Sequence, residues 1–152
     1  MRLKLRTVVS QSVHQVMSGF TEDLFLKLSP PFPPVKLLQF DGSRTGDVVS
    51  LELNFLFFRQ TWTSHITHHE ETADRFSFID EGVLLPFFLG SWRHHHIIEA
   101  HPEGSVIIDD ISFRGRWFWM TPLLYPLLFL QFAYRKPIYR RYFRGTKKEP
   151  SA

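Results

Sequence analysis

The stretch that decides the fold is residues 117–134, WFWMTPLLYPLLFLQFAY, which carries no charged residue and is flanked by Arg116 and Arg135. Thr121 followed by Pro122 predicts a helix start, because threonine caps helix N-termini and proline is favoured at the first helical position. A helix that begins there has thirteen uncharged residues, or ~20 Å, whereas a bilayer core is about 30 Å thick. We therefore expect a helix packed within a folded domain. A membrane anchor followed by a basic cap is the alternative.

One apolar stripe follows this helix at helical spacing and continues past Arg135 and Lys136. It consists of Leu123, Leu127, Leu130, Tyr134 and Ile138. An amphipathic pattern of this kind is typical of a helix that lies on a sheet, so we expect the stripe to face the interior. Pro137 argues against a straight helix as far as Phe143.

Composition favours a single domain with a large core or a lined cavity. The chain has 152 residues, of which 43% are hydrophobic and 16% aromatic, including sixteen Phe. The lack of cysteine excludes disulfides, thiolate nucleophiles and Cys-ligated zinc. The N-terminus MRLKLRTVVSQSV has no continuous apolar segment of the signal-peptide type, so we expect a cytoplasmic protein.

Positive charge is concentrated at the C-terminal end. From Arg135 onward seven Lys and Arg face Glu149 alone, whereas residues 1–134 have a net charge of −3. We expect a solvated helix end that complements its own dipole, followed by a basic, disordered tail over residues 146–152. Peripheral contact of Arg135–Lys148 with an anionic membrane is the alternative. Nucleic-acid binding is not expected, because the chain has no groove-reading motif.

Two short helices and a series of strands precede this end. Residues 3–9 alternate as a strand does, Ser12 and Thr21 are expected to cap helices over 13–20 and 22–29, and the prolines of residues 30–34 predict an extended linker. From Val35 to Phe113 the sequence predicts antiparallel strands with one apolar face.

The segments WRHHHIIEA and SVIIDDISF are expected to pair around the loop HPEG. If Ala100 faces Ser105, then His96 faces Asp109, and Trp92 faces Phe113. We assign this face to the interior because it carries both aromatic residues.

The histidines of this hairpin invite a metal site, but neighbouring strand residues point to opposite faces. His95 therefore points away from His94 and His96. His94, His96 and Asp109 offer three ligands in principle. We expect instead that no metal or other cofactor is bound, and that His96 donates a hydrogen bond to Asp109 in an apolar pocket. A purely structural cross-strand pair is the alternative.

The order of elements resembles the helix-grip fold of the SRPBCC superfamily, the START-like domains that include polyketide cyclases, coenzyme Q-binding proteins and the birch-pollen allergen family. The motifs FDG, FIDEGVLLPFFLGSWRHHHIIEA, VIIDDISF and FAYRKPIYRRYF are similar to those of a bacterial ligand-binding subgroup. The resemblance covers nearly all of residues 1–145, which we take as one domain.

This resemblance implies an α+β domain in which a curved antiparallel sheet wraps around a long C-terminal helix and encloses a cavity. We expect the protein to bind a hydrophobic small molecule (lipid, isoprenoid, polyketide or aromatic) as a monomer or homodimer. The alternatives are a cyclase or aromatase in which His96 and Asp109 move protons, and a core that side chains simply fill. The expected cavity residues are Leu51, Leu53, Phe55, Trp62, Phe76, Phe78, Trp92, His94, His96, Asp109, Ile111, Phe113, Leu123, Leu127, Leu130 and Tyr134.

Overall fold

A curved antiparallel sheet of seven strands makes up most of the protein. The computed structural model describes residues 1–144, and within them the strand order is β1-β7-β6-β5-β4-β3-β2. The elements are β1 (Arg2–Val9), α1 (Val13–Ser18), α2 (Glu22–Leu28), β2 (Val35–Phe40), β3 (Val48–Asn54), β4 (Arg59–Glu71), β5 (Arg75–Leu84), β6 (Leu89–His101), β7 (Gly104–Gly115) and α3 (Met120–Tyr142).

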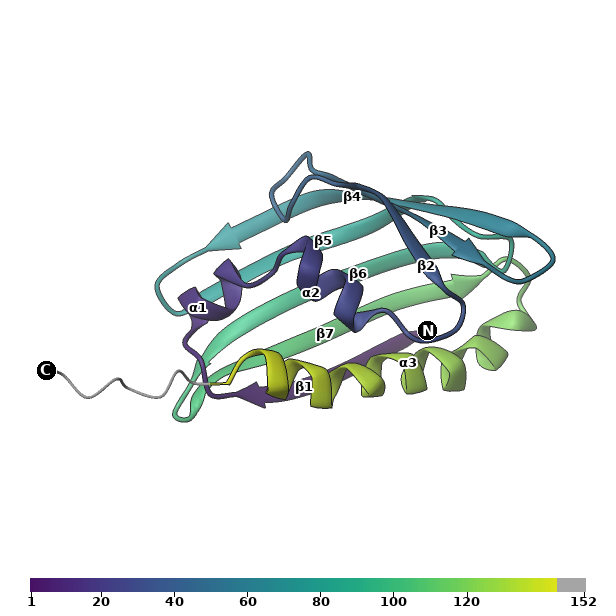
Figure 1. Ribbon diagram of the computed structural model, residues 1–152. Helices are drawn as coiled ribbons and strands as arrows, with labels where there is room; N and C mark the ends of the chain where they lie inside the picture. The colour runs from purple at the N-terminus through teal and green to yellow at the C-terminus, as the bar shows by residue number, and fades with distance from the viewer. Residues whose placement is uncertain (145–152) are drawn as a thin grey trace, which may run out of the picture.

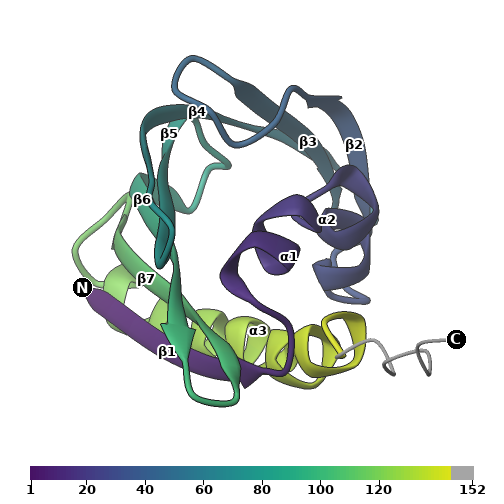
Figure 2. The ribbon, with the colours of Figure 1, turned by 90° about the vertical axis from the view of Figure 1, so that its left-hand side faces the viewer.

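The sheet curls around α3, and the two short helices lie along its open side (Figures 1 and 2). This is the predicted helix-grip architecture. The expected domain end at residue 145 and the expected tail over residues 146–152 lie outside the described residues and stay predictions.

The β6–β7 hairpin has the predicted register. His96 lies opposite Asp109, and Trp92 opposite Phe113. The turn needs Gly104, whose φ is +143° and where an added Cβ would lie 2.5 Å from the carbonyl oxygen of Val9. Only glycine adopts this conformation without strain.

The two short helices begin at the predicted caps. The Ser12 hydroxyl accepts a hydrogen bond from the Gln15 amide, and the Gln15 side chain accepts one from the Ser12 amide, so the two residues form a capping box. The Thr21 hydroxyl accepts from the Leu24 amide at 3.5 Å, and α2 ends at Leu28 before the prolines. The backbone between these helices places Phe20 over the inner face of the sheet, 6.0 Å from the ring of Phe78.

Helix α3 differs from the expectation in its start, its length and its face. It begins at Met120, and Thr121 accepts a hydrogen bond from the Gly115 amide at 3.0 Å instead of capping the helix. Pro137 lies within the helix and does not end it. None of the helices in residues 1–144 combines the length and apolar character that a bilayer crossing requires.

The buried face of α3 consists of Leu124, Leu128, Phe132 and Tyr139. The predicted stripe of Leu123, Leu127, Leu130 and Tyr134 is exposed instead. The predicted face is therefore wrong for these four residues. Because apolar residues occur on nearly every side of α3, spacing alone does not distinguish the face that packs on the sheet.

Candidate functional site

A cavity of about 190 Å³ lies between the inner face of the sheet, α2 and α3. Its apolar wall is built by all three layers. It includes Phe20, Leu24, Phe25, Leu28, Val35, Phe40, Val49, Leu51, Leu53, Phe55, Trp62, Ile66, Phe78, Phe88, Trp92, Leu128 and Phe132. One water molecule requires about 10–15 Å³, so this space exceeds an ordinary packing defect.

The expected cavity residues fall into three groups. Eight of them line the cavity: Leu51, Leu53, Phe55, Trp62, Phe78, Trp92, His94 and His96. Four are buried behind the wall: Phe76, Asp109, Ile111 and Phe113. The remaining four are the α3 residues that point outward, and they do not belong to the cavity.

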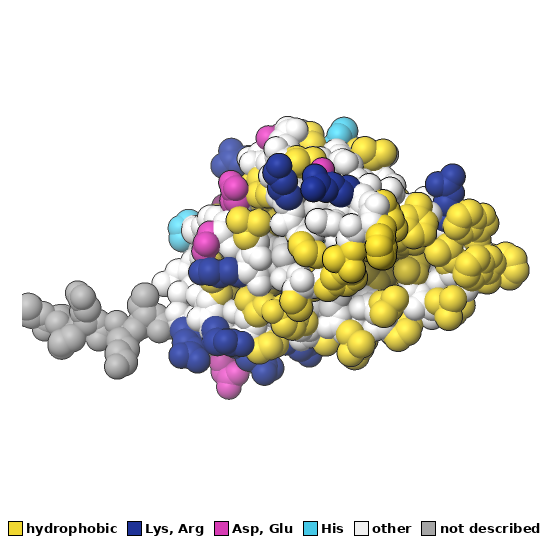
Figure 3. Space-filling model, turned by 45° about the vertical axis from the view of Figure 1, so that its right-hand side comes forward, with side chains coloured by type: hydrophobic (Ala, Val, Ile, Leu, Met, Phe, Trp, Pro, Cys, Tyr) yellow, Lys and Arg dark blue, Asp and Glu magenta, His cyan; other side chains and the backbone are white. Residues whose placement is uncertain are grey.

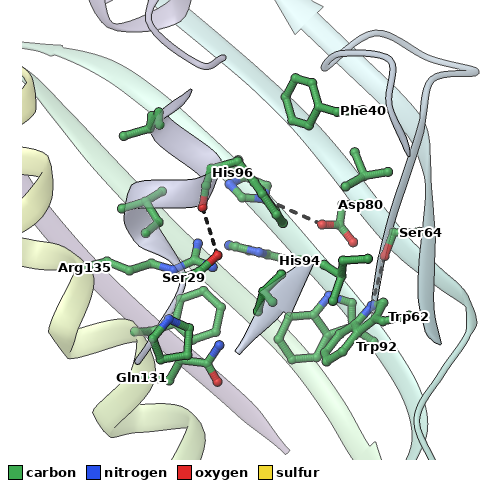
Figure 4. Close-up of a pocket in the computed structure, with 18 of the residues that line it drawn as sticks. Ser29, Phe40, Trp62, Ser64, Asp80, Trp92, His94, His96, Gln131 and Arg135 are labelled. Carbon is green, nitrogen blue, oxygen red and sulfur yellow. Dashed lines mark hydrogen bonds and ion pairs between the residues drawn. The ribbon is translucent and has the colours of Figure 1, made fainter. Parts of the chain in front are cut away.

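Polar side chains gather at one place on this apolar wall (Figure 4). His94 and His96 come from β6, Asp80 from β5, and Arg135 and Gln131 from α3. His94, His96 and Asp80 lie on the same face of the sheet. His94 and His96 are two residues apart on β6, and Asp80 of β5 lies directly opposite His94.

The shortest contact in this cluster joins His94 and Asp109. Nε2 of His94 lies 2.9 Å from Oδ1 of Asp109, and both side chains are 3% exposed. The His94 ring forms T-shaped contacts with the rings of Phe132 and Trp92, at centroid distances of 5.1 and 6.0 Å. The sequence predicted this bond for His96, so the partner of Asp109 is corrected to His94.

His96 lies between two carboxylates, close enough for an ion pair with each but too far for a hydrogen bond. Its Nδ1 is 3.8 Å from Oδ1 of Asp109, and its Nε2 is 3.9 Å from Oδ2 of Asp80. Both distances exceed the length of a hydrogen bond. The ring is held by stacking on Phe78 at 4.3 Å and on His94 at 3.5 Å between centroids.

The environment determines the charge of the His94–Asp109 pair. Burial, together with the neighbouring His96, lowers the pKa of His94 to about 4. Burial alone would raise the pKa of Asp109, but the hydrogen bond from His94 and nearby positive charge hold that pKa below its ordinary value. At neutral pH, His94 is therefore neutral and Asp109 is ionised.

This charge state fixes the tautomer of His94. An ionised carboxylate only accepts hydrogen bonds, so Nε2 of His94 carries the proton and donates the hydrogen bond to Asp109. Nδ1 of His94 is then left with a free lone pair. The pair has the arrangement of a histidine base oriented by a carboxylate.

Arg135 brings a positive charge to the cavity wall. Its guanidinium lies 4.2 Å from the centroid of the Phe132 ring. Within residues 1–144, its Nε is buried and lacks a hydrogen-bond partner, as do Oδ1 of Asp80 and Nδ1 of His96. Each unsatisfied buried polar atom costs about 1–3 kcal/mol, so a molecule that paired with these atoms would be favoured.

Asp80, His94 and His96 also have the residue types of a metal site. One ligand atom from each lies within 4.8 Å of the others, and a carboxylate behind a histidine is common at metal sites. However, the two imidazole rings stack with only 33° between their planes, so their in-plane lone pairs run side by side. One ring would have to turn for both histidines to hold one ion. The prediction that no metal is bound stays a prediction.

Sequence reasoning missed Asp80 and Arg135. Asp80 shares a strand face with Phe76 and Phe78, so alternation along β5 was a signal that could have found it. Arg135 follows Leu128 and Phe132 at helical spacing. It would have been found had the buried face of α3 been known.

No protein-family model matches the chain, and no curated protein matches it by sequence. Solved structures match it by fold. The Zhui aromatase/cyclase from Streptomyces sp. R1128 has a TM-score of 0.67 at 14% identity, over 90% of this chain and 89% of that one. A protein from Chromobacterium violaceum has a TM-score of 0.69 at 15% identity, over 95% and 99% of the two chains.

Plant proteins share the same architecture. The major latex-like protein 151 from Panax ginseng has a TM-score of 0.61 at 14% identity, over 91% of this chain and 96% of that one. At such identities the likeness establishes the fold alone. The chain therefore has the helix-grip fold, as its sequence predicted.

Proposed function

We propose that the protein binds a hydrophobic small molecule inside the cavity between the sheet and α3. The observation that carries this proposal is an apolar wall interrupted by one polar cluster whose Asp80, His96 and Arg135 atoms lack partners within the described chain. Pockets for small molecules have this composition, in which apolar walls supply affinity and a few polar groups orient the ligand.

The polar cluster indicates which ligand chemistry suits the cavity. Arg135 and His96 can donate hydrogen bonds, Asp80 accepts them, and Nδ1 of His94 accepts one more. A molecule with a long or aromatic apolar body and one carboxylate, phenol or carbonyl group fits this arrangement. Covering the apolar wall contributes about 25 cal/mol for each Å² removed from water.

The first experiment is native mass spectrometry of freshly purified protein that has never met detergent, followed by denaturing extraction of anything bound. A discrete additional mass is expected. Titration with an environment-sensitive dye provides the second measurement, and the absence of saturable binding at micromolar protein would contradict the cavity.

A matched pair of variants makes the dye titration specific to the cavity. Leu51→Trp fills the wall on β3, whereas Leu38→Trp adds the same ring to an exposed position on the neighbouring β2. Leu51→Trp is expected to weaken dye binding about tenfold or more, and Leu38→Trp to leave it unchanged. Equal effects would mean that the dye binds elsewhere.

A cyclase or aromatase is the second candidate function. His94 lines the cavity and is oriented by Asp109, and a free Nδ1 lone pair would let it act as a general base. One of the fold neighbours is described as an aromatase/cyclase. Loss of turnover of a polyketide-type substrate in His94→Gln, with ligand affinity intact, would support catalysis. Loss of affinity alone would favour binding.

Three further predictions remain open. The first is contact of the basic segment Arg135–Lys148 with an anionic membrane. Arg135 lines the cavity, which argues against its part in that contact. Residues from 145 onward lie outside the described chain. Cytoplasmic location and a monomeric or homodimeric state stay predictions from the sequence.

A further inference from the structure

Three loops at one end of the molecule carry large exposed apolar side chains. Figure 1 places the β3–β4, β5–β6 and β7–α3 connections at the same end, and Figure 3 shows apolar side chains gathered there. We call this surface the aromatic end. It consists of Leu56, Phe57, Phe58, Phe87, Trp117, Phe118 and Trp119.

The aromatic end is tied together by contacts between the loops. The Phe58 and Phe87 rings meet at 5.6 Å between centroids, and the Phe87 amide donates to the Gln60 side chain at 3.1 Å. The Arg116 amide donates to the Phe88 carbonyl at 3.1 Å. The exposed rings are therefore held on a braced platform.

The exposed apolar surface continues along the outer face of α3. Leu123, Leu127 and Leu130 are each more than 60% exposed, and Tyr134 extends the row. Contiguous apolar patches of this kind on a protein surface mark interaction sites. The row begins at Leu123, one helical turn after Trp119, so the aromatic end and the outer face of α3 form one surface.

The charge around this surface is positive. The segments 55–59, 83–88 and 114–134 contain Arg59, Arg114 and Arg116 and no acidic residue. Arg59 pairs with Glu52 of β3 at 3.6 Å, so the positive charge comes mainly from Arg114 and Arg116. The guanidinium of Arg116 lies 5.6 Å from the centroid of the Trp117 ring. Tryptophan and arginine together are typical of side chains placed at the level of lipid headgroups.

The aromatic end is also continuous with the cavity. Phe55 and Phe88 line the cavity and meet at 6.0 Å between ring centroids. Phe55 stacks on the exposed Phe58 at 5.2 Å, and Phe88 packs against the exposed Phe87 at 5.4 Å. An unbroken series of aromatic rings thus leads from the cavity wall to the outside.

We propose that the aromatic end and the outer face of α3 form a docking surface for a lipid bilayer that contains anionic lipids. The most protruding rings, Phe57 and Phe118, are 95% and 90% exposed and would enter the boundary between headgroups and acyl chains, while the arginines meet the headgroups. A second protein copy would cover the surface by matching its shape. Phe57 and Phe118 protrude almost fully exposed from two different loops, which suits a deformable partner better.

The route from this surface to the cavity rests on the proposed ligand-binding function; the docking itself does not. An apolar ligand that dissolves in a bilayer would pass along Phe58 and Phe55 without crossing water. The cavity would then be filled from the membrane.

The test uses the full chain and vesicles of phosphatidylcholine with and without phosphatidylserine, read out by cosedimentation. Binding is expected to both compositions and to be stronger with phosphatidylserine. Phe57→Ser combined with Phe118→Ser is expected to weaken it about tenfold or more, because the bilayer no longer removes two large apolar rings from water. Arg114→Gln combined with Arg116→Gln should lower the affinity for vesicles with phosphatidylserine by about fivefold per arginine. The affinity for vesicles of phosphatidylcholine alone should not change.

Leu26→Ser combined with Leu38→Ser is the matched control, because both leucines are exposed and lie away from the three loops. This variant should bind vesicles as the unaltered protein does. Vesicle binding that the Phe57 and Phe118 substitutions leave intact would overturn the proposal. So would a failure of the unaltered protein to bind either vesicle.

Two parallel measurements identify what failed. Dye binding in the cavity is measured on every variant in the absence of vesicles. If the protein binds dye but not vesicles, the docking surface is wrong and the cavity proposal stands. If it binds vesicles but not dye, the cavity proposal is wrong and the docking surface stands. Sedimentation velocity shows whether a second copy covers the surface, and a dimer that the Phe57 and Phe118 substitutions dissociate would overturn membrane docking.

Discussion

His94 and Asp109 are joined diagonally across the β6–β7 pair, not face to face. The residue opposite His94 is Ile111, and the residue opposite Asp109 is His96. Even so, the hydrogen bond at 2.9 Å runs to His94, while His96 stays 3.8 Å from the same oxygen. Asp109 is therefore the nearest carboxylate to both histidines.

Removing the charge of Asp109 should destabilise the fold. Asp109→Asn keeps the size of the side chain but loses the charged acceptor of the His94 bond, and a hydrogen bond to a buried charged group contributes about 1.5–3 kcal/mol. Urea unfolding is expected to show a loss of about 2 kcal/mol in the free energy of unfolding.

Asp110→Asn is the matched control for this change. Asp110 points to the other face of β7 and pairs with the largely exposed Arg2, where water screens the interaction. The loss should be clearly smaller than for Asp109→Asn. Equal losses in the free energy of unfolding would mean that the buried His94–Asp109 bond contributes no more to stability than the exposed Arg2–Asp110 pair.

The stability of the protein should fall as the pH drops from about 6.5 to 4. His94 has an unfolded pKa of about 6.5, and burial lowers its folded pKa to about 4. The unfolded chain therefore takes up the proton first, and stability that is complete above pH 6.5 is lost towards pH 4, by an amount on the order of 3 kcal/mol. Urea midpoints measured across this range at constant ionic strength test the expectation.

The variant His94→Gln isolates the contribution of His94. The other ionisable groups around it are His96, Arg135, Asp80 and Asp109. The lowered pKa values of Asp80 and Asp109 add a loss of stability only below about pH 4. His94→Gln should therefore flatten the curve between pH 6.5 and 4. An unchanged slope would assign the effect to other groups, such as His95.

Truncation should destabilise the protein strongly at one position of α3 and only slightly at another position two residues away. Phe132 is 2% exposed and packs against Trp92 and His94, whereas Leu130 is 65% exposed. Phe132→Ala is expected to cost about 3 kcal/mol in thermal or urea unfolding, and Leu130→Ala less than about 0.5 kcal/mol. A large loss of stability in Leu130→Ala would mean that the face predicted from the sequence, and not the observed one, packs on the sheet.

Arg135 should select ligands that carry a negative charge. Because its buried Nε lacks a partner among the described residues, a long-chain carboxylate is expected to bind at least about tenfold more weakly to Arg135→Met. The matching long-chain alcohol should bind equally to both proteins. Arg140→Met, at an exposed position of the same helix, is the control; equal weakening of both ligands would contradict a charge effect.

Local signals predicted the parts of the fold that depend on neighbouring residues. Ser12 and Thr21 begin the two short helices as expected, and the tight turn at Pro102 and Glu103, followed by Gly104, determines the β6–β7 register. In each case the chemistry of a few consecutive residues leaves one favourable arrangement. The order of these elements then predicted the helix-grip fold, which the structure confirms.

The parts that depend on distant residues were harder to predict. The buried face of α3 is selected by its contacts with the sheet, such as Phe132 against Trp92, and apolar residues on nearly every side of the helix hid that face. The hairpin register identified which residues oppose each other. However, His96 stacks on Phe78, and Asp109 therefore forms its hydrogen bond with His94. Such choices belong to side-chain packing, which strand alternation does not determine.

The pairing of the first strand with the last has a consequence for the timing of folding. Partners in β1 and β7 are about a hundred residues apart in the chain, and contacts of such separation form slowly. At ribosomal rates of about 5–20 residues per second, β1 waits at least about 5 s for its partner to be synthesised. The β6–β7 hairpin closes locally as soon as it emerges, so it offers the template onto which β1 is added. The N-terminal strand is thus synthesised first and joins the sheet among the last.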